Sequence, residues 1–153
     1  MSDILSQVPQ LTMGYAAQPY DNIVTGGQPT PADMTLLKAA GIDNIINMRM
    51  PGEQSEFNDA QAAQSAGLNY IAMPIAGEPA ISLDAAQELD AVLAELQGNT
   101  LVHCATSNRV GALFAIRAAI IQGKSMDDAI AEGQAAGLSG LLGKTVSVIE
   151  AHK

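Results

Sequence analysis

The sequence predicts an α/β domain in which helices cover both faces of a central, mostly parallel sheet of four to five strands. Short apolar segments alternate four times with segments of helical periodicity, the order that is typical of such sheets. Glycine or proline separates most of these segments, as expected for turns between packed elements. The length of 153 residues fits a single domain, and a hydrophobic content of 48% allows a sizeable core.

The first strand and the first helix are predicted near the start of this domain. Residues 22–26 have the composition of a short strand, and a proline-rich turn follows them. Thr30 suits an N-cap, Pro31 suits the first helical position, and Asp33 completes a capping box. Gly41 then predicts a left-handed end to the helix.

The second and third predicted strands each lead into a loop. The second strand covers residues 43–48, and the loop 49–53 follows it. A helix rich in alanine and glutamine is expected over 56–66, before a third strand over 68–75. The loop 76–80 comes next. Because parallel strands end at one edge of a sheet, we expect these loops to lie near each other, where ligands bind in such folds.

The rest of the chain predicts one more strand and four helices. An amphipathic helix begins after Ser82, and the fourth strand covers 99–103. The helix over 109–122 is apolar nearly all round, which indicates that it is buried in the middle of the domain. Two further helices are expected over 125–136 and 139–151.

Charge and composition disfavour several classes of function. Asp and Glu number 16 against 7 for Lys and Arg, and the net charge of −9 opposes binding to nucleic acids. Aromatic residues are only 3%, so platforms for base stacking are not expected. The single cysteine suits a reducing compartment. Because no signal peptide and no apolar run of membrane-spanning length is recognisable, we expect a cytoplasmic protein that does not bind membranes.

The segment between the fourth strand and the helix over 109–122 carries the clearest chemical signal. Cys104 ends the strand and Arg109 opens the helix. The residues between them are Ala105, Thr106, Ser107 and Asn108. Backbone N–H groups of residues 105–109 can converge on an anion, and the helix adds its positive N-terminus. Arg109 offers a bidentate donor, and this environment favours the nucleophilic thiolate of Cys104.

Other interpretations of the same residues are less specific. A lone cysteine at a strand end is usually a small buried hydrophobic residue. An arginine at a helix N-terminus, however, opposes the helix dipole, which indicates that Arg109 has a specific role. His103 is expected to be a satisfied, buried residue that braces the loop, and Asn108 to be the N-cap of the helix. Arg49 could lie near the site or on the surface.

The segment from His103 to Leu113 resembles the phosphate loop of cysteine-based phosphatases, specifically the bacterial phosphatase-like domain of beta-lactamase hydrolase-like proteins. Gly27-Gln28-Pro29 and the strand from Asn44 to Arg49 share the resemblance, which covers about residues 14 to 145. It implies a phosphatase-like three-layer α/β/α domain over residues 14–153, preceded by an N-terminal extension over residues 1–13.

The resemblance also implies a reaction. Cys104 would be the nucleophile of a protein tyrosine phosphatase-like hydrolase that forms a phosphocysteine intermediate, and Arg109 would clamp the phosphate oxygens. Phosphatases take a general acid from the loop that here covers residues 76–80, which contains no aspartate. Glu78 is the candidate by position and Glu53 the second, although either fits a solvated loop carboxylate.

Three features depart from the common phosphatase pattern. Four residues, not five, separate Cys104 from Arg109, a spacing close to that of rhodanese-like sulfurtransferases and shared by the phosphatase-like family. Ser107 stands where the family usually has glycine, so a positive φ there would strain it by roughly 1–3 kcal/mol. Val110 replaces the Ser or Thr that often helps the thiolate leave.

Three hypotheses follow from the sequence. The first is a cysteine-dependent phosphatase that acts on phosphotyrosine or a small phosphomonoester. The second is a sulfurtransferase that carries a persulfide on Cys104, and the third is a non-catalytic anion-binding module. The expected ligand is a small phosphate, sulfate or persulfide group, or a phosphorylated protein side chain. No cofactor is implied, and two distant histidines with one cysteine form no metal-ligand pattern.

Overall fold

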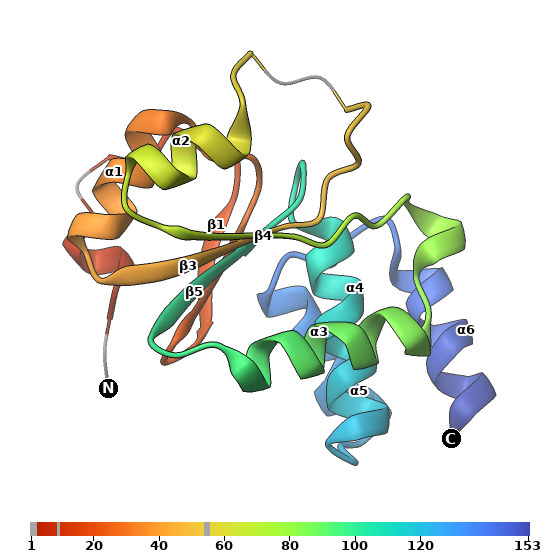
Figure 1. Ribbon diagram of the computed structural model, residues 1–153. Helices are drawn as coiled ribbons and strands as arrows, with labels where there is room; N and C mark the ends of the chain where they lie inside the picture. Colours follow the sequence, from red (N-terminus) through yellow and green to blue (C-terminus); the bar gives the residue numbers. More distant parts are fainter. Residues whose placement is uncertain (1–2, 9, 54–55) are drawn as a thin grey trace.

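A five-stranded sheet forms the centre of the computed structural model, which describes residues 3–8, 10–53 and 56–153 (Figure 1). Its strands are β1 (Ala16–Tyr20), β2 (Ile23–Gly26), β3 (Ile42–Asn47), β4 (Asn69–Ala72) and β5 (Asn99–His103). Their spatial order is β1-β2-β5-β3-β4. The pairs from β2 to β4 are parallel, and β1 is antiparallel to β2. The predicted mostly parallel sheet of an α/β fold is confirmed.

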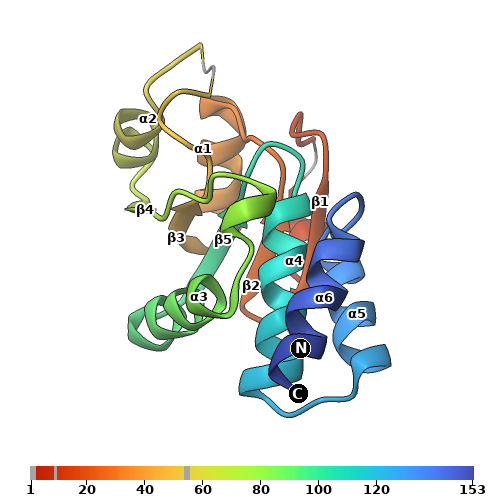
Figure 2. The ribbon, with the colours of Figure 1, turned by 90° about the vertical axis from the view of Figure 1, so that its right-hand side faces the viewer.

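Helices form a layer on each face of this sheet, as Figures 1 and 2 show. The shorter layer contains α1 (Pro31–Ala39) and α2 (Asp59–Ser65). The thicker layer contains α3 (Leu83–Glu95), α4 (Asn108–Ile116), α5 (Met126–Ala135) and α6 (Leu142–His152). A π-helical segment, η3 (Arg117–Ile121), continues α4, and two 3-10 turns are η1 (Leu5–Gln7) and η2 (Glu78–Ala80). The expected three-layer α/β/α arrangement is therefore present.

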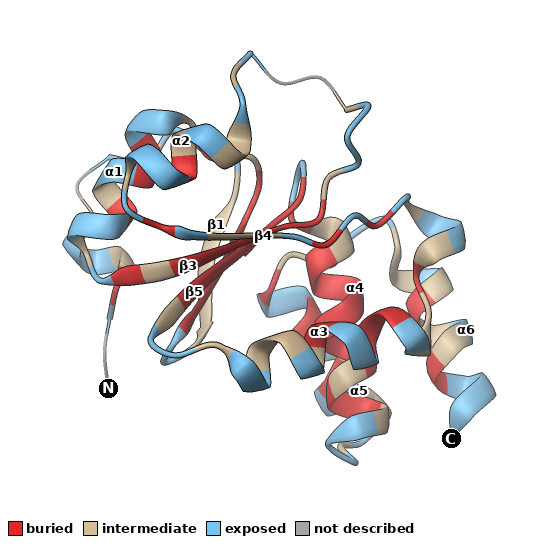
Figure 3. Ribbon diagram, viewed as in Figure 1, coloured by how far each residue is buried: buried red, intermediate tan, exposed pale blue. Residues whose placement is uncertain are grey.

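Strand alternation divides the core into two apolar clusters. Ile46 and Val102 face the layer that contains α4, whereas Ile45 and Leu101 face the layer that contains α1. Every residue from 110 to 116 is buried, which makes α4 the central helix, as its apolar sequence predicts (Figure 3). The helix thus holds a fixed position directly behind the end of β5.

Local signals in the sequence place several helix ends correctly. The Thr30 side chain accepts a hydrogen bond from the Asp33 N–H, and the Asp33 carboxylate accepts one from the Thr30 N–H. Gly41 ends this helix with φ of 109°. Ser82 caps α3 by accepting from the Ala85 N–H at 3.1 Å. The two capped helices lie on opposite faces of the sheet and frame the loops at its edge.

Several predicted boundaries are wrong. β1 was not predicted, because Pro19 is typical of turns; on an edge strand its missing N–H is tolerated. The strand expected over 68–75 ends at Ala72. The chain still follows β3 beyond that point, because the Met73 N–H donates to the Asn47 carbonyl and the Ile75 N–H donates to the Met48 carbonyl. Helix α2 begins later than expected, because Asn58 caps it by accepting from the Gln61 N–H.

The N-terminal segment contacts the α1 face of the sheet. Ile4 and Met13 are buried there among Val24 and Leu101. Residues 1–2 and 9 lie outside the described residues, and the division of the chain at residue 13 stays a prediction. Within the described ranges, no helix has both the length and the apolar character needed to cross a membrane.

Candidate active site

Cys104 is held at the end of the central strand. Its N–H donates to the Gly26 carbonyl at 3.3 Å, and the Met48 N–H donates to the preceding carbonyl, that of His103, at 2.8 Å. Cys104 is 1% exposed and belongs to the cluster that packs on α4. Neighbouring strands on both sides therefore fix the position of its backbone.

The turn after Cys104 packs closely against the end of β2. The Gln28 N–H donates to the Ala105 carbonyl at 3.2 Å, and Gly27 forms a bridge with Thr106. A Cβ atom on Gly27 would lie only 2.7 Å from the Ala105 oxygen. Glycine is needed at this position, which gives a structural reason for the Gly27-Gln28 part of the sequence motif.

Ser107 adopts the strained conformation that its position predicts. Its φ of 70° and ψ of 0° are left-handed, and it is the one non-glycine residue with positive φ in the described part of the chain. The buried Ser107 hydroxyl donates to the Ala136 carbonyl at 2.6 Å. A Cβ atom on Gly137 would lie 2.4 Å from that of Ser107. This hydrogen bond and the adjacent glycine hold the loop in its strained shape.

The start of α4 differs from the prediction. Ser107, not Asn108, is the N-cap residue, and it makes no side-chain capping bond because its hydroxyl is turned toward Ala136. Asn108 is the first residue of the helix, and its Oδ1 accepts from the N–H groups of Ser139 and Leu141 at 2.8 and 3.2 Å. Its side chain therefore joins α4 to the segment before α6 instead of capping the helix.

Backbone donors of the loop are available to an anion. The N–H groups of Ala105, Thr106, Asn108 and Arg109 donate no hydrogen bond to any residue that the structure describes. The last two belong to the first turn of α4, where the helix dipole is positive. Backbone donors are therefore present in the loop, and its binding of an anion stays a prediction.

The Arg109 guanidinium is held by two loops. Its Nη1 and Nη2 donate to the two Glu53 carboxylate oxygens at 2.7 and 2.8 Å, and Nη1 also donates to the Ile75 carbonyl at 3.0 Å. Of the five guanidinium N–H groups, Nε–H and the second Nη2–H remain for an anion. The pKa of Arg109 is raised, chiefly by its hydrogen bond with Glu53 and further by the nearby Cys104. The guanidinium is therefore held in its charged form by Glu53.

Glu53 is a strongly held carboxylate. Its hydrogen bond with Arg109 is the main reason that its pKa falls to about 2. The Met50 N–H donates to its Oε2 at 2.5 Å, and the Arg49 Nε lies 3.4 Å from its Oε1. Since such a group is ionised at neutral pH, Glu53 can hold Arg109 in place but cannot supply a proton.

The remaining predicted residues lie around this centre. Glu78 is exposed on η2, and its side chain makes no hydrogen bond or ion pair with the described residues. Arg49 lies beside the site and not on the open surface: its side chain is 12% exposed and donates to the Gln28 Oε1 at 2.5 Å. Gln28 in turn donates to Asp59 at 2.7 Å. The contacts of Arg49 and Gln28 therefore connect the loop over residues 49–53 to helix α2.

His103 is fully buried, but it is only partly satisfied. Its Nδ1 lies 3.2 Å from the Cys104 carbonyl oxygen, and an N–H there must donate because a carbonyl only accepts. Its Nε2 has no partner among the described residues. Burial is the main cause that lowers the pKa of His103 to about 4. The ring is therefore neutral at pH 7 and braces the Cys104 carbonyl.

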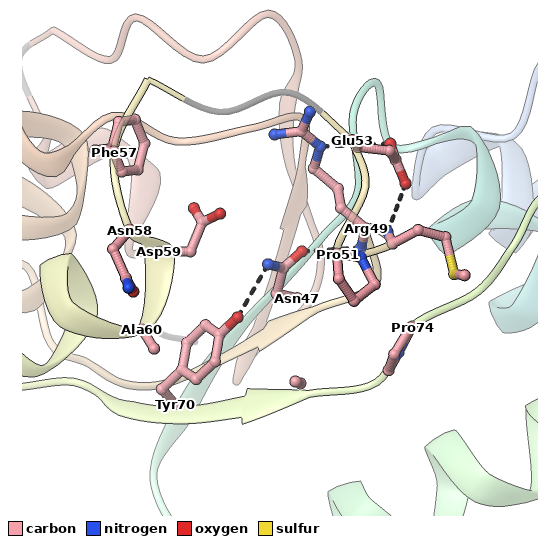
Figure 4. A pocket seen from close by; sticks show the side chains of 12 residues that line it. Asn47, Arg49, Pro51, Glu53, Phe57, Asn58, Asp59, Ala60, Tyr70 and Pro74 are labelled. Carbon is pink, nitrogen blue, oxygen red and sulfur yellow. Dashed lines mark hydrogen bonds and ion pairs between the residues drawn. The ribbon is translucent and has the colours of Figure 1, made fainter.

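A cavity of about 420 Å³ opens next to Glu53 (Figure 4). Its lining residues are Asn47, Arg49, Met50, Pro51, Glu53, Phe57, Asn58, Asp59, Ala60, Tyr70, Ala72 and Pro74. Sequence reasoning missed Asp59 and Tyr70, since a carboxylate in a first helical turn and an aromatic residue in a strand have ordinary structural explanations. Among the described residues, no cluster of three or more His, Cys, Asp or Glu could hold a metal ion.

Comparison with known proteins gives a consistent family relationship. The family model described as beta-lactamase hydrolase-like protein, phosphatase-like domain, matches residues 20–121. A beta-lactamase hydrolase-like protein of Xylella fastidiosa is 31% identical over 134 residues, 85% of this chain. Another from Agrobacterium fabrum is 30% identical over 115 residues, 71% of this chain. This chain spans 30% of the Xylella relative and 26% of the Agrobacterium relative.

Solved structures share the fold at low sequence identity. A Neisseria meningitidis protein with a provisional phosphatase assignment matches with a TM-score of 0.76 and 22% identity, covering 90% of this chain and 97% of that one. TpbA of P. aeruginosa, in complex with pTyr, matches with a TM-score of 0.61 and 17% identity, covering 92% and 90% of the two chains. The architecture is therefore the one seen in phosphatase-like proteins.

Proposed function

The chain belongs to the family of phosphatase-like domains of beta-lactamase hydrolase-like proteins, and from this we propose that it hydrolyses phosphomonoesters through a covalent intermediate on Cys104. The substrate class is phosphotyrosine or a small phosphomonoester, as in protein tyrosine phosphatase-like hydrolases. Because the chain spans only 30% of the length of its Xylella relative, the proposal concerns the activity of this domain alone.

Phosphate binding rests on local donors and not on the overall charge. The donors available for phosphate are the N–H groups of residues 105, 106, 108 and 109, which donate to no described residue, and the two remaining guanidinium N–H groups of Arg109. These donors are fixed before the ligand arrives, so they stabilise the phosphate oxygens without reorganising. The net charge of −9 disfavours large polyanions and leaves small phosphate groups as ligands.

The first step transfers the phosphoryl group to sulfur. The Cys104 thiolate attacks phosphorus, an S–P bond forms, and the P–O bond to the alcohol breaks. The electron pair of that bond leaves on the alcohol oxygen, which takes a proton from the candidate acid Glu78. Arg109 and the loop amides stabilise the charge on the equatorial oxygens throughout this step.

The second step restores the enzyme. Water attacks phosphorus, the S–P bond breaks with its electron pair returning to Cys104, and the proton of the water moves to the Glu78 carboxylate. Inorganic phosphate leaves. Val110 has no hydroxyl to stabilise the departing thiolate, so we expect this step to be the slower one and phosphocysteine to accumulate.

The observation that supports the proposal is the bidentate hold of Glu53 on Arg109, at the end of a loop in which the N–H groups of residues 105, 106, 108 and 109 donate to no described residue. Release of phosphate from an aryl phosphate, measured from pH 5 to pH 8 for the wild type and for Cys104→Ser, tests it. We expect turnover by the wild type and none by the variant. Equal inactivity of both proteins would contradict hydrolysis by Cys104.

A second candidate is sulfur transfer through a Cys104 persulfide. The four-residue spacing between Cys104 and Arg109 favours it, because the short ring is typical of rhodanese-like active loops. The thiolate would take the outer sulfur of thiosulfate, releasing sulfite, and would then pass it to an acceptor thiol. Mass spectrometry after incubation with thiosulfate is the test, and the absence of added sulfur on Cys104 would reject this function.

A further inference from the structure

The cavity in Figure 4 is connected to the phosphate loop through Glu53, which lines the cavity and bonds to Arg109 at the end of that loop. Arg49 and Glu53 line it, and Glu53 is the residue that both guanidinium termini of Arg109 contact. A phosphate held by the loop would therefore place its ester group near the mouth of the cavity. A volume of about 420 Å³ is large enough for a small-molecule group beyond the phosphate.

The walls of this cavity combine apolar and polar surfaces in similar measure. Phe57 and Tyr70 supply aromatic rings from the two ends of the segment that contains α2, and Pro51 and Pro74 also line the cavity (Figure 4). The Tyr70 hydroxyl accepts from Asn47 at 3.1 Å, which fixes the ring and leaves its own O–H to donate. Such walls suit an aromatic or aliphatic body.

Asp59 gives the cavity a negative charge. Its carboxylate points into the open space between Phe57 and Tyr70 (Figure 4). Its Oδ1 accepts from the Gln28 amide at 2.7 Å, and no described residue forms an ion pair with it. The neutral amide holds the carboxylate in place without cancelling its charge. A cationic group between this carboxylate and the aromatic rings would be attracted by both.

The positive charge in the lining is already engaged. Arg49 also borders the cavity, but its guanidinium contacts Glu53 and donates to Gln28. Two arginines, Arg49 and Arg109, thus share the Glu53 carboxylate, and the Arg49 guanidinium also bonds to the Gln28 amide that holds Asp59. The charged residues of the lining are Arg49, Glu53 and Asp59, so the lining carries a net negative charge.

We propose that this cavity binds the alcohol part of the substrate and that Asp59 selects phosphomonoesters whose leaving group carries an ammonium group. The inference rests on the proposed phosphatase function and adds the substrate class to it. A substrate with its phosphate in the loop and its cation beside Asp59 matches the net negative charge of the cavity lining. A leaving group with a carboxylate in the same place is repelled.

A pair of isosteric substrates tests this selection. Tyramine phosphate carries an ammonium group, and its analogue carries a carboxylate in place of the ammonium. For the wild type we expect kcat/KM to be at least about fivefold higher for the ammonium compound. In Asp59→Asn, which keeps the side-chain shape and can still accept from Gln28, we expect the ratio to fall close to one. The control Asp84→Asn removes an exposed carboxylate from α3 and should keep the wild-type ratio.

The ratio of kcat/KM for the two compounds is taken within each protein. A general loss of activity or stability lowers both values and therefore leaves this ratio unchanged. A wild-type enzyme with no preference, or with a preference for the carboxylate compound, would overturn the inference. An unchanged preference in Asp59→Asn would overturn it as well.

Failure of the phosphatase function itself can be recognised separately. If neither compound is hydrolysed, the proposed function fails, and calorimetry on Cys104→Ser still measures the two dissociation constants. Tighter binding of tyramine phosphate, lost when Asp59→Asn is added, would support the cavity assignment without turnover. Equal binding of the two compounds, or no binding of either, would reject it.

Discussion

Two arginine–carboxylate pairs at opposite ends of one helical segment have the same chemistry and different environments. Arg109 lies in the first turn of α4 and binds both oxygens of Glu53, with side chains 13% and 27% exposed. Arg117, in η3, makes a single bond from Nε to Asp90 at 2.9 Å and packs over the Phe114 ring at 5.9 Å. The first pair joins the loop after β3 to the start of α4, whereas the second joins η3 to α3.

The difference shows that an ion pair becomes part of a site through its neighbours. Arg109 closes a loop in which the N–H groups of residues 105, 106, 108 and 109 donate to no described residue, and two of its own guanidinium N–H groups donate to none. Arg117 lies against an aromatic ring and a carboxylate of α3, and nothing in the described structure there resembles an anion loop. We therefore expect substitutions at the first pair to change catalysis and those at the second to change stability slightly.

The largest expected effect comes from Arg109→Lys. Lysine keeps the positive charge, but it lacks the planar guanidinium that can bind Glu53 and a phosphate at the same time. We expect kcat/KM for an aryl phosphate to fall about 10²- to 10³-fold, as for the loss of one oxyanion donor. The matched change Arg117→Lys should leave kcat/KM near the wild-type value. Equal losses in the two variants would remove the distinction between the pairs.

The second largest effect is expected from a change that disturbs the shape of the loop over residues 104–109. Gly137→Ala makes such a change. The added Cβ would meet Ser107 at 2.4 Å, and φ of 117° disfavours any side chain. We expect a loss of about 2 kcal/mol in the free energy of unfolding, measured with urea. Gly143→Ala is the control, because it lies in α6 with no atom within 4 Å of the new Cβ. A stable Gly137→Ala protein would contradict the idea that this glycine holds Ser107.

A smaller effect is expected when Glu53 is neutralised. Glu53→Gln keeps the shape but weakens the hold on Arg109, so we expect kcat/KM to fall about tenfold. If Glu53 acts only by positioning, the acidic limb of the pH–rate profile should stay where it is in the wild type. Asp90→Asn makes the matched change at the other pair and should leave the rate unchanged. A shift of the acidic limb in Glu53→Gln would instead indicate proton transfer.

Much of this site could be predicted because its signals are local. The Cys104-to-Arg109 turn, the capping box at Thr30 and the strained Ser107 each depend on residues close together in the sequence. The pairing of Glu53 with Arg109, 56 positions away, and the cavity around Asp59 depend on tertiary packing. Asn108 was predicted to be the cap because its residue type favours that role, but Ser107 takes the position in a left-handed conformation.

The smallest predicted effect concerns the pH dependence of stability. The pKa of His103 is about 4 in the folded protein and near 6.5 when unfolded, so its contribution is complete above pH 6.5 and is lost as the pH falls toward 4. Between pH 6 and pH 5 this residue should lower the free energy of unfolding by about 1 kcal/mol. His103→Gln should remove that part of the slope. His152→Gln, at the exposed end of α6, should retain it, and an identical slope in all three proteins would refute the assignment.

Trapping the intermediate tests the central claim most directly. The wild type would be mixed with an aryl phosphate, quenched in acid within the first turnover and digested for mass spectrometry. The account predicts one phosphoryl group on the peptide that contains Cys104, and none when Arg109→Lys is treated in the same way. Phosphate release without a phosphorylated Cys104, when the intermediate is expected to accumulate, would contradict it.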